Sequence, residues 1–415
     1  MLYPRFRINM PLEEVGRFLL SALGPADGNA AVEFGKMFKE FGGFEDVVST
    51  GSGRAGFRLL LEALDFPPGS EIIFPAYTFH PMPIAAAEHG LRPVFVDVDE
   101  KTWNIDPEKV PALVNEKTRA VVPTHLFGVP AELEALGDLA REHDLFLIED
   151  CAHALGAVYR DRMVGNFGGA AIFTFAMSKN MPSWGGGAVA VKDPVLAGKM
   201  KEKMSGRPVP TSGMVLRRHL FTIFAMMATQ PVFFPWTLYP ALRIADYRGS
   251  DYFDRPFLEP VIPPRSGRLS RGGISPLSPL QAETGLRQLR RFPEGLAAQV
   301  ANARRLRELL EDCPTLRLQE EPDGSRSSFL SVRAQVPDPG GIRSALLAAG
   351  VDTKPDDMKN CAALEFFGGN DPCPVAAGLG GHCIELPCSP YYSQRQIERL
   401  AVRVRAAVSP AGKTP

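Results

Sequence analysis

Short apolar runs alternate, through the first half of the chain, with segments of helical periodicity. The runs, rich in β-branched and aromatic residues, occupy 71–76, 92–98, 119–128, 144–153, 170–176 and 187–192. Residues 130–143, between two of them, place apolar side chains at helical spacing. Strand, helix and strand in succession predict a mainly parallel sheet covered by helices. Ligands of such sheets bind beyond the carboxyl ends of the strands.

The pattern changes after about residue 285. A long helix is predicted over 295–313, then short apolar runs, a helix over 341–350 and a last helix over 393–408. A chain of 415 residues is longer than one core usually serves. We therefore predict a large ligand-binding domain over 1–204, an apolar segment over 205–275 and a small α+β domain over 276–415.

Composition excludes some classes of function. Charged residues make up 22% of the chain and the formal net charge is −1, so nucleic acid is not an expected partner. Residues 1–15 lack the features of a signal peptide, which predicts a cytoplasmic protein. The cysteines form no CxxC pair, so we expect buried thiols and no metal site; they are Cys151, Cys313, Cys361, Cys373, Cys383 and Cys388.

One lysine, Lys179, stands between an apolar run and three glycines, in IFTFAMSKNMPSWGGGAVAV. A buried lysine is costly unless it is neutral or bonded. Pyridoxal phosphate enzymes use such a lysine for a Schiff base, while a carboxylate keeps the pyridine nitrogen protonated. Asp150 ends an apolar run and offers that carboxylate, and by strand alternation Glu149 points to the opposite face.

A glycine-rich turn precedes a predicted helix in STGSGRAGFRLLLEAL. Backbone N–H groups at a helix start bind phosphate, and glycine permits its close approach. Gly53 therefore becomes a candidate phosphate contact, and Arg54 adds a cation. Such a turn is common, so it indicates phosphate binding only together with the lysine and the aspartate.

These residues, with VFVDVDEKTWNIDPEKV, VVPTHLFGVPAELEAL and IEDCAHALGA, resemble the DegT-type sugar aminotransferases. The resemblance implies the fold type I architecture of pyridoxal phosphate enzymes, with a seven-stranded sheet, a smaller C-terminal domain and a homodimer with the cofactor near its interface. By position, Lys179 corresponds to the Schiff-base lysine and Asp150 to the partner of the pyridine nitrogen. Thr174 corresponds to a phosphate-binding hydroxyl, and Gly53 and Arg54 to the phosphate loop.

Two further positions follow from the same resemblance. Phe79 corresponds to the aromatic residue that stacks on the cofactor ring, and His153 stands where the family usually has glutamine, near the ring hydroxyl. Each residue also has a structural interpretation. Asp150 could cap a helix, Phe79 and Thr174 could belong to the core, and His125 could make a structural hydrogen bond. The ordered set of loop, aromatic, aspartate and lysine favours the cofactor.

The chain also departs from the family pattern. Trp184 and Gly185 stand in the glycine run where an acidic residue is usual. Ile274 and Pro276 align with an asparagine and an arginine, of which the asparagine normally reaches the phosphate of the neighbouring subunit. His80, Pro81 and Met82 replace small and hydroxyl residues near the substrate.

Residues 220–242 contain no charge and are rich in phenylalanine and methionine, with arginines on both sides. The length would suit a membrane span, but three prolines argue against one. Two interpretations stay open: an arm that packs across a dimer, or an element that contacts a membrane surface or a lipid-like substrate.

Together these features predict an aminotransferase that takes an amino group, most simply from glutamate, and gives it to a keto or aldehyde acceptor. The acceptor classes are a nucleotide-linked keto sugar and a lipid-linked or hydrophobic carbonyl compound. The alternatives are a pyridoxal phosphate lyase or decarboxylase, and a regulatory protein that keeps the fold without turnover.

Overall fold

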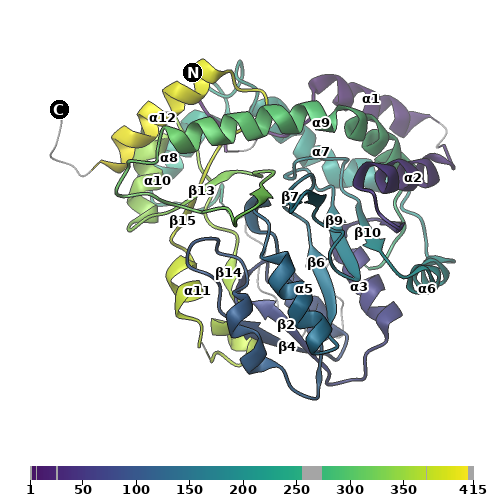
Figure 1. The fold of residues 1–415 in the computed structure, drawn as a ribbon. Helices are drawn as coiled ribbons and strands as arrows, with labels where there is room; N and C mark the ends of the chain where they lie inside the picture. Colours follow the sequence, from purple (N-terminus) through teal and green to yellow (C-terminus); the bar gives the residue numbers. More distant parts are fainter. Residues whose placement is uncertain (1, 6, 25–26, 255–272, 371, 410–415) are drawn as a thin grey trace.

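The structure is a computed structural model and describes residues 2–5, 7–24, 27–254, 273–370 and 372–409 (Figure 1). The helices are α1 (Leu12–Leu23), α2 (Ala30–Gly42), α3 (Gly53–Leu64), α4 (Pro81–Glu88), α5 (Leu133–Glu142), α6 (Pro194–Met204), α7 (Ser212–Ala228), α8 (Leu238–Tyr247), α9 (Pro279–Glu308), α10 (Pro339–Ala348), α11 (Pro374–Leu379) and α12 (Gln394–Val408). The strands are β1 (Asp46–Thr50), β2 (Glu71–Pro75), β3 (Tyr77–Thr78), β4 (Arg92–Val96), β5 (Thr118–Val121), β6 (Phe146–Asp150), β7 (Val158–Tyr159), β8 (Arg162–Met163), β9 (Ala170–Thr174), β10 (Gly187–Val191), β11 (Arg317–Leu318), β12 (Ser325–Arg326), β13 (Val332–Gln335), β14 (Lys359–Asn360) and β15 (Cys383–Leu386).

A seven-stranded sheet in the order β1-β10-β9-β6-β5-β2-β4 forms the centre of the large domain. Only β10 runs antiparallel to its neighbours in this sheet. The six strands expected from apolar runs are therefore confirmed as a mainly parallel sheet. The strand pattern did not single out β1, which lies immediately before the glycine-rich turn.

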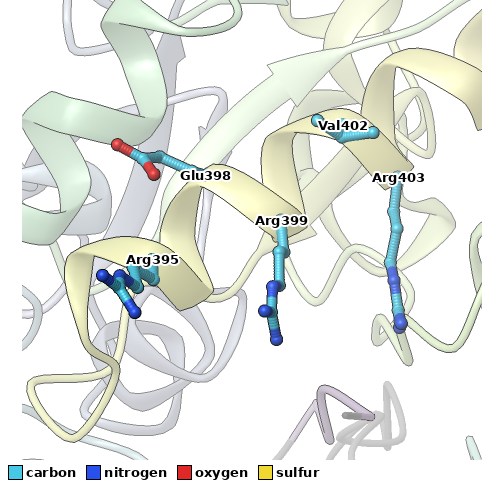
Figure 2. A pocket seen from close by; sticks show the side chains of 5 residues that line it. All are labelled: Arg395, Glu398, Arg399, Val402 and Arg403. Atoms are coloured by element: carbon cyan, nitrogen blue, oxygen red, sulfur yellow. The ribbon is translucent and has the colours of Figure 1, made fainter.

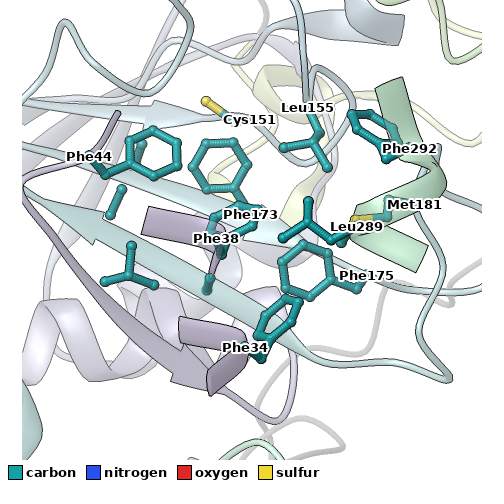
Figure 3. Close-up of a cluster of buried hydrophobic side chains, with 14 of the residues drawn as sticks. Phe34, Phe38, Phe44, Cys151, Leu155, Phe173, Phe175, Met181, Leu289 and Phe292 are labelled. Carbon is teal, nitrogen blue, oxygen red and sulfur yellow. The ribbon is translucent and has the colours of Figure 1, made fainter. Parts of the chain in front are cut away.

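Alternation along each strand sends side chains to two helical layers. Phe173 faces a cluster with α2 and α9, in which the rings of Phe34, Phe38 and Phe175 lie together (Figure 3). Ile172, its neighbour, faces α3, α4 and α6 instead. Both faces are covered, so the carboxyl ends of the strands are left as the place for a ligand.

The long helix α9 joins the two domains, packing against α2 at one end and α12 at the other (Figure 1). It begins at Pro279, so the predicted start at residue 295 was wrong. Ser278 and Gln281 form a capping box at its start. Pro293 lies inside the helix, at a position where proline usually ends one.

The small domain contains the antiparallel sheet β11-β13-β15, covered by α10 and α12. The first residues of the chain join it, because Tyr3 pairs with Val351 and is buried in its core. Part of 1–204 thus packs with the C-terminal residues, and our division of the chain into domains stays a prediction. Residues 255–272 of the predicted segment 205–275 lie outside the described residues.

The apolar segment folds as two helices, α7 and α8, with Pro231 and Pro235 between them. Among the residues that the structure describes, no helix combines the length and the apolar character needed to cross a membrane.

Candidate active site

Lys179 lies in the loop between β9 and β10, beyond the carboxyl end of β9. Its backbone N–H donates a hydrogen bond to the carbonyl of Ala176. Farther along the loop, the backbone N–H of Ser183 donates to the carbonyl of Phe175, which follows the end of β9. Burial lowers the pKa of Lys179 to about 8, although the carboxylates of Asp357 and Asp150 oppose that shift. A lysine with this pKa is partly neutral near pH 7.5, which a nucleophilic or proton-transferring amine requires.

Asp150 ends β6 and is 2% exposed. Its backbone bonds to Pro123 and His125 extend the strand, and Oδ1 accepts the N–H of Ala152 at 3.0 Å. Burial raises the pKa of this carboxyl, whereas the Ala152 N–H and the charge of Lys179 lower it. A cation placed beside it would stabilise the ionised form further.

Glu149 faces the other side of the strand, as strand alternation predicts. It accepts bonds from the backbone N–H groups of Gly165, Phe167 and Gly168 and lies 3.3 Å from Nε2 of His125. Nδ1 of His125 accepts the N–H of Ala131, so Nε2 carries the proton and donates to Glu149.

Cys151 lies beside His125 and Glu149. The side-chain atoms of these three residues that could bind a metal ion lie within 4.8 Å of one another. Burial raises the pKa of Glu149, but His125 and the N–H groups of Gly168 and Gly165 more than offset it. A carboxylate already satisfied in this way holds the turn after β8 in place. His125 thus makes a structural hydrogen bond; its other interpretation, a place in the surroundings of the cofactor, stays a prediction.

His153 is buried, and Nδ1 accepts the backbone N–H of Phe127 at 3.2 Å. Burial, and then the charge of Lys179, hold the pKa of this imidazole well below its usual value. His153 is therefore neutral at physiological pH, with its proton on Nε2. The sequence placed Lys179, Asp150 and His153 in one site, and in the structure the charge of Lys179 acts on both of the other two.

The glycine-rich turn and Thr174 also come together. Gly53 starts α3, and a Cβ at this residue would lie 2.9 Å from Cβ of Thr174. The hydroxyl of Ser52 caps the helix by accepting the N–H of Ala55. Arg54 occupies the second helical position. Glycine therefore lets the start of α3 approach Thr174 closely, and a helix start with a hydroxyl beside it is suited to binding a phosphate.

The segment that carries Phe79 lies beside the strand end that carries Asp150. Oγ1 of Thr78 is 3.1 Å from Oγ1 of Thr124, which pairs with Asp150. Phe79 itself is partly exposed and packs against the core on either side. Its stacking on a cofactor ring stays a prediction.

Three charged residues near Lys179 had no signal in the sequence. Asp357 forms an ion pair with Lys354 at 3.0 Å, and Arg333 lies 3.5 Å from the same carboxylate. Burial raises the pKa of Asp357, but the charges of Lys354, Arg333 and Lys179 lower it far more. These residues come from the small domain, so only the folded chain brings them to the lysine.

The segment before α9 contacts the glycine-rich turn. The carbonyl of Ser275 accepts the N–H of Gly51 at 2.7 Å, and its hydroxyl occupies the space a Cβ at Gly51 would need. Ile274 is buried in the core and Pro276 pairs with Thr50. Neither aligned position offers a polar side chain, whereas the hydroxyl of Ser275, which the sequence analysis did not single out, lies beside the turn.

Trp184 has a structural role. It adopts a left-handed backbone conformation with φ +58° and stacks on Phe18 at 4.1 Å. Its carbonyl accepts the side-chain N–H of Gln281 at 2.9 Å. The indole therefore fixes the loop behind Lys179 to α1 and α9.

A sequence profile of the DegT/DnrJ/EryC1/StrS aminotransferase family matches residues 12–219 and 267–405. The chain belongs to this family. The matched parts contain every residue of the site described above, and residues 220–266 fall between them.

Relatives and solved structures agree with this assignment. The pleiotropic regulatory protein of Geobacillus stearothermophilus is 41% identical over 155 residues, 37% of this chain and 42% of that protein. The L-glutamine:2-deoxy-scyllo-inosose aminotransferase of Streptomyces lividus is 41% identical over 180 residues, 43% of this chain and 42% of that protein. The chain thus spans less than half the length of these curated relatives. DesI, crystallised in the presence of its TDP-sugar product, is 26% identical with a TM-score of 0.71, covering 98% of this chain and 93% of that one. This likeness confirms the fold class.

Proposed function

We propose that this protein is a pyridoxal phosphate-dependent aminotransferase that moves an amino group from an amino acid to the ketone of a cyclic sugar. The observation that carries the proposal is Lys179, an amine with a pKa of about 8, which shares a site with the buried Asp150. Membership of an aminotransferase family supports the same chemistry.

The residues present fit the cofactor. Lys179 would bond to its aldehyde, Asp150 would hold its pyridine nitrogen, and the start of α3 at Gly53 with Thr174 would hold its phosphate. Once bound, pyridoxal phosphate supplies an electron sink for a carbanion at the substrate carbon. The site has the chemistry that this cofactor requires: a lysine whose pKa is lowered, a carboxylate whose ionised form a neighbouring cation stabilises, and a helix start that Gly53 lets approach the hydroxyl of Thr174 closely.

Each residue then has a task. The neutral amine of Lys179 takes the proton from Cα of the amino donor and later returns a proton to the carbon of the acceptor. His153, neutral and protonated on Nε2, offers a hydrogen-bond donor. Asp357 sustains the protonated form of Lys179, so the amine is available both as base and as acid.

The acceptor classes are proposed from the relatives and from the surface of the chain. One relative is named for an inosose substrate and for glutamine as amino donor, and DesI was crystallised in the presence of its TDP-sugar product. A nucleotide-linked keto sugar or a cyclic polyol ketone is therefore the first class to test, with glutamate and glutamine as donors. A lipid-linked carbonyl compound is the second class, because α7 and α8 expose apolar side chains. We also propose a homodimer, as the family resemblance implies.

The decisive experiment has two readouts. The first is attachment: the protein is incubated with pyridoxal phosphate, reduced with borohydride and digested, and the modified lysine is located by mass spectrometry. The second is release of the keto acid from glutamate or glutamine without an acceptor. We expect both in the native chain and in Lys36→Ala, a variant of an exposed lysine on α2, and neither in a folded Lys179→Ala variant.

Other outcomes have a clear meaning. Attachment at Lys179 with loss of carbon dioxide or of a substituent, but no keto acid, would favour the lyase or decarboxylase. Attachment with no turnover of any amino donor would favour the regulatory alternative, to which the name of the Geobacillus relative corresponds. Modification of a different lysine would refute the proposed site.

A further inference from the structure

Helix α7 and the turn between α7 and α8 carry a group of large apolar side chains that are exposed to solvent. We call this group the apolar surface; it consists of Leu220, Phe221, Phe224, Val232, Phe233 and Trp236. Trp236 is 85% exposed and Phe224 67%. Soluble monomers rarely expose such a group, which usually marks an interaction site.

Buried contacts on the opposite side of α7, the turn and α8 keep the apolar surface facing the solvent. On α7, Val215 and Met226 are buried with α1 and Trp184. Phe234 in the turn and Leu242 on α8 pack on Leu347, and the hydroxyl of Tyr239 donates to the carbonyl of Leu347 at 2.9 Å. Rotating the exposed rings inward would break these contacts, so the exposure is a property of the fold.

Positive charge surrounds the apolar surface. Arg217 and Arg218 are exposed one turn before Phe221, and Arg243 and Arg248 are exposed on α8. Between residues 207 and 250 the chain has five arginines and one acidic residue, Asp246, whose carboxylate accepts the hydroxyl of Ser344. A basic rim around exposed aromatic side chains suits the interface of an anionic bilayer.

A second basic feature borders this region. Arg395, Arg399 and Arg403 follow one another at four-residue spacing on α12 and line a shallow surface pocket of about 530 Å³ (Figure 2). A Cβ at Gly350 would lie 2.7 Å from both Arg403 and Leu2. Leu2 in turn packs with Phe234 and Leu242, so the arginine row adjoins the anchor of α8.

We propose that the apolar surface docks on an anionic lipid bilayer, with its aromatic side chains at the level of the headgroups and the flanking arginines on lipid phosphates. A second copy of the chain suits the surface less well, because an identical copy brings another arginine-rich rim and no acidic rim to complement Arg217, Arg218 and Arg243. In addition, residues 220–266 are not matched by the family profile, so this surface is an addition to the fold that the family shares.

Tryptophan fluorescence of the full-length protein tests the proposal directly. The chain has three tryptophans, of which Trp103 and Trp184 are fully buried, so a change in emission on docking reports on Trp236. The probe is vesicles of phosphatidylcholine, with or without phosphatidylglycerol. We expect the protein to float with the anionic vesicles, to shift its emission to the blue, and to dissociate in high salt.

Variants separate the contribution of the apolar side chains to vesicle binding from that of the arginines. Phe221→Ser with Phe224→Ser should weaken vesicle binding at least about tenfold, and Arg217→Glu with Arg218→Glu should abolish the preference for anionic lipid. Val195→Ser, which removes an exposed apolar side chain on α6, should bind like the native protein. None of these residues belongs to the proposed active site.

Two results would overturn the proposal. The first is an emission spectrum and a flotation profile that do not respond to anionic vesicles. The second is a native dimer that becomes monomeric in the phenylalanine variant while vesicle binding is absent, which would make the surface an interface between copies. Neither readout requires turnover, so they stand apart from the test of the aminotransferase.

Discussion

The backbone N–H of Phe127 donates a hydrogen bond to Nδ1 of His153 across 3.2 Å. Phe127 adopts φ +57°, its ring stacks on the imidazole at 5.6 Å, and the guanidinium of Arg333 lies 4.0 Å from its centre. The bond leaves the His153 proton on Nε2, while burial and the charge of Lys179 keep the imidazole neutral by lowering its pKa. The backbone N–H of Phe127 thus determines that His153 presents a hydrogen-bond donor, its Nε2–H, to the site.

We predict that His153→Gln will keep most of the activity and His153→Ala will not keep the stability. The glutamine oxygen can accept the Phe127 N–H, whereas alanine leaves a buried donor unpaired, which costs about 1–3 kcal/mol. Denaturant unfolding and kcat/KM for both variants check this. Equal losses of stability in the two variants would mean that the bond from Phe127 contributes little.

We predict opposite shifts in the pKa of Lys179 from two neighbouring substitutions. Asp357 raises this pKa and Lys354 lowers it, around a value of about 8. Asp357→Asn should therefore move the titration of the amine to lower pH and Lys354→Met to higher pH. The rate at which an amine reagent modifies Lys179 in the cofactor-free protein, followed by peptide mass spectrometry against pH, measures both.

The exposed Lys36 on α2 is the internal control for that titration, because it belongs to a helix of the large domain and neither substitution is on that helix. Shifts of the same sign in the two variants would contradict the electrostatic role given to Asp357 and Lys354. If the titration of Lys36 shifted together with that of Lys179, the shift would come from the reagent and not from the site.

The part of the site that sequence reasoning found depends on local chemistry. Asp150 ends an apolar run, Lys179 follows one, and Gly53 opens a helix, so each carries its signal within a few residues. The opposite orientation of Glu149 also followed from alternation alone. The same locality explains why the sheet was predicted from its apolar runs.

The part that was missed depends on long-range packing. Arg333, Lys354 and Asp357 belong to the small domain, and no spacing in the sequence relates them to Lys179. The start of α9 was also missed, because Pro293 is tolerated inside a helix whose capping box lies much earlier. The residues that stand in place of the missing asparagine and arginine also have no local signal in the sequence. Ser275 contacts Gly51 only because the fold brings two distant segments together.

We predict that Arg333→Met will destabilise the fold by about 3–5 kcal/mol, because it removes the cation that faces the buried Asp356 and leaves Lys354 alone to balance Asp357 and Glu385. Arg333 is 1% exposed and lies 2.5 Å from Glu385 and 3.9 Å from Asp356. Adding Glu385→Gln should recover part of the loss, since one of the charges is then removed. Urea unfolding of the single and double variants measures the effect. A single-variant loss below about 1 kcal/mol would show that water already screens this cluster.

We predict that His219 makes the fold sensitive to acid. It lies on the buried side of α7, with its ring 5.6 Å from that of Trp184. Burial, and then the charge of Arg218, lower its pKa to about 4. The unfolded chain takes up a proton at this residue below its ordinary pKa of about 6.5, whereas the folded chain does so only near pH 4. Stability from this residue is therefore complete above pH 6.5 and falls as the pH decreases from 6.5 to 4.

His219→Phe keeps an aromatic ring against Trp184 and cannot bind the proton. Linkage then predicts that, between pH 7.5 and pH 5, the native protein loses about 2 kcal/mol more unfolding free energy than the variant. Unfolding curves at the two pH values for both proteins give this difference directly. Because every other titrating group is common to the two proteins, parallel losses would mean that His219 is protonated in the folded state and that α7 opens to admit the proton.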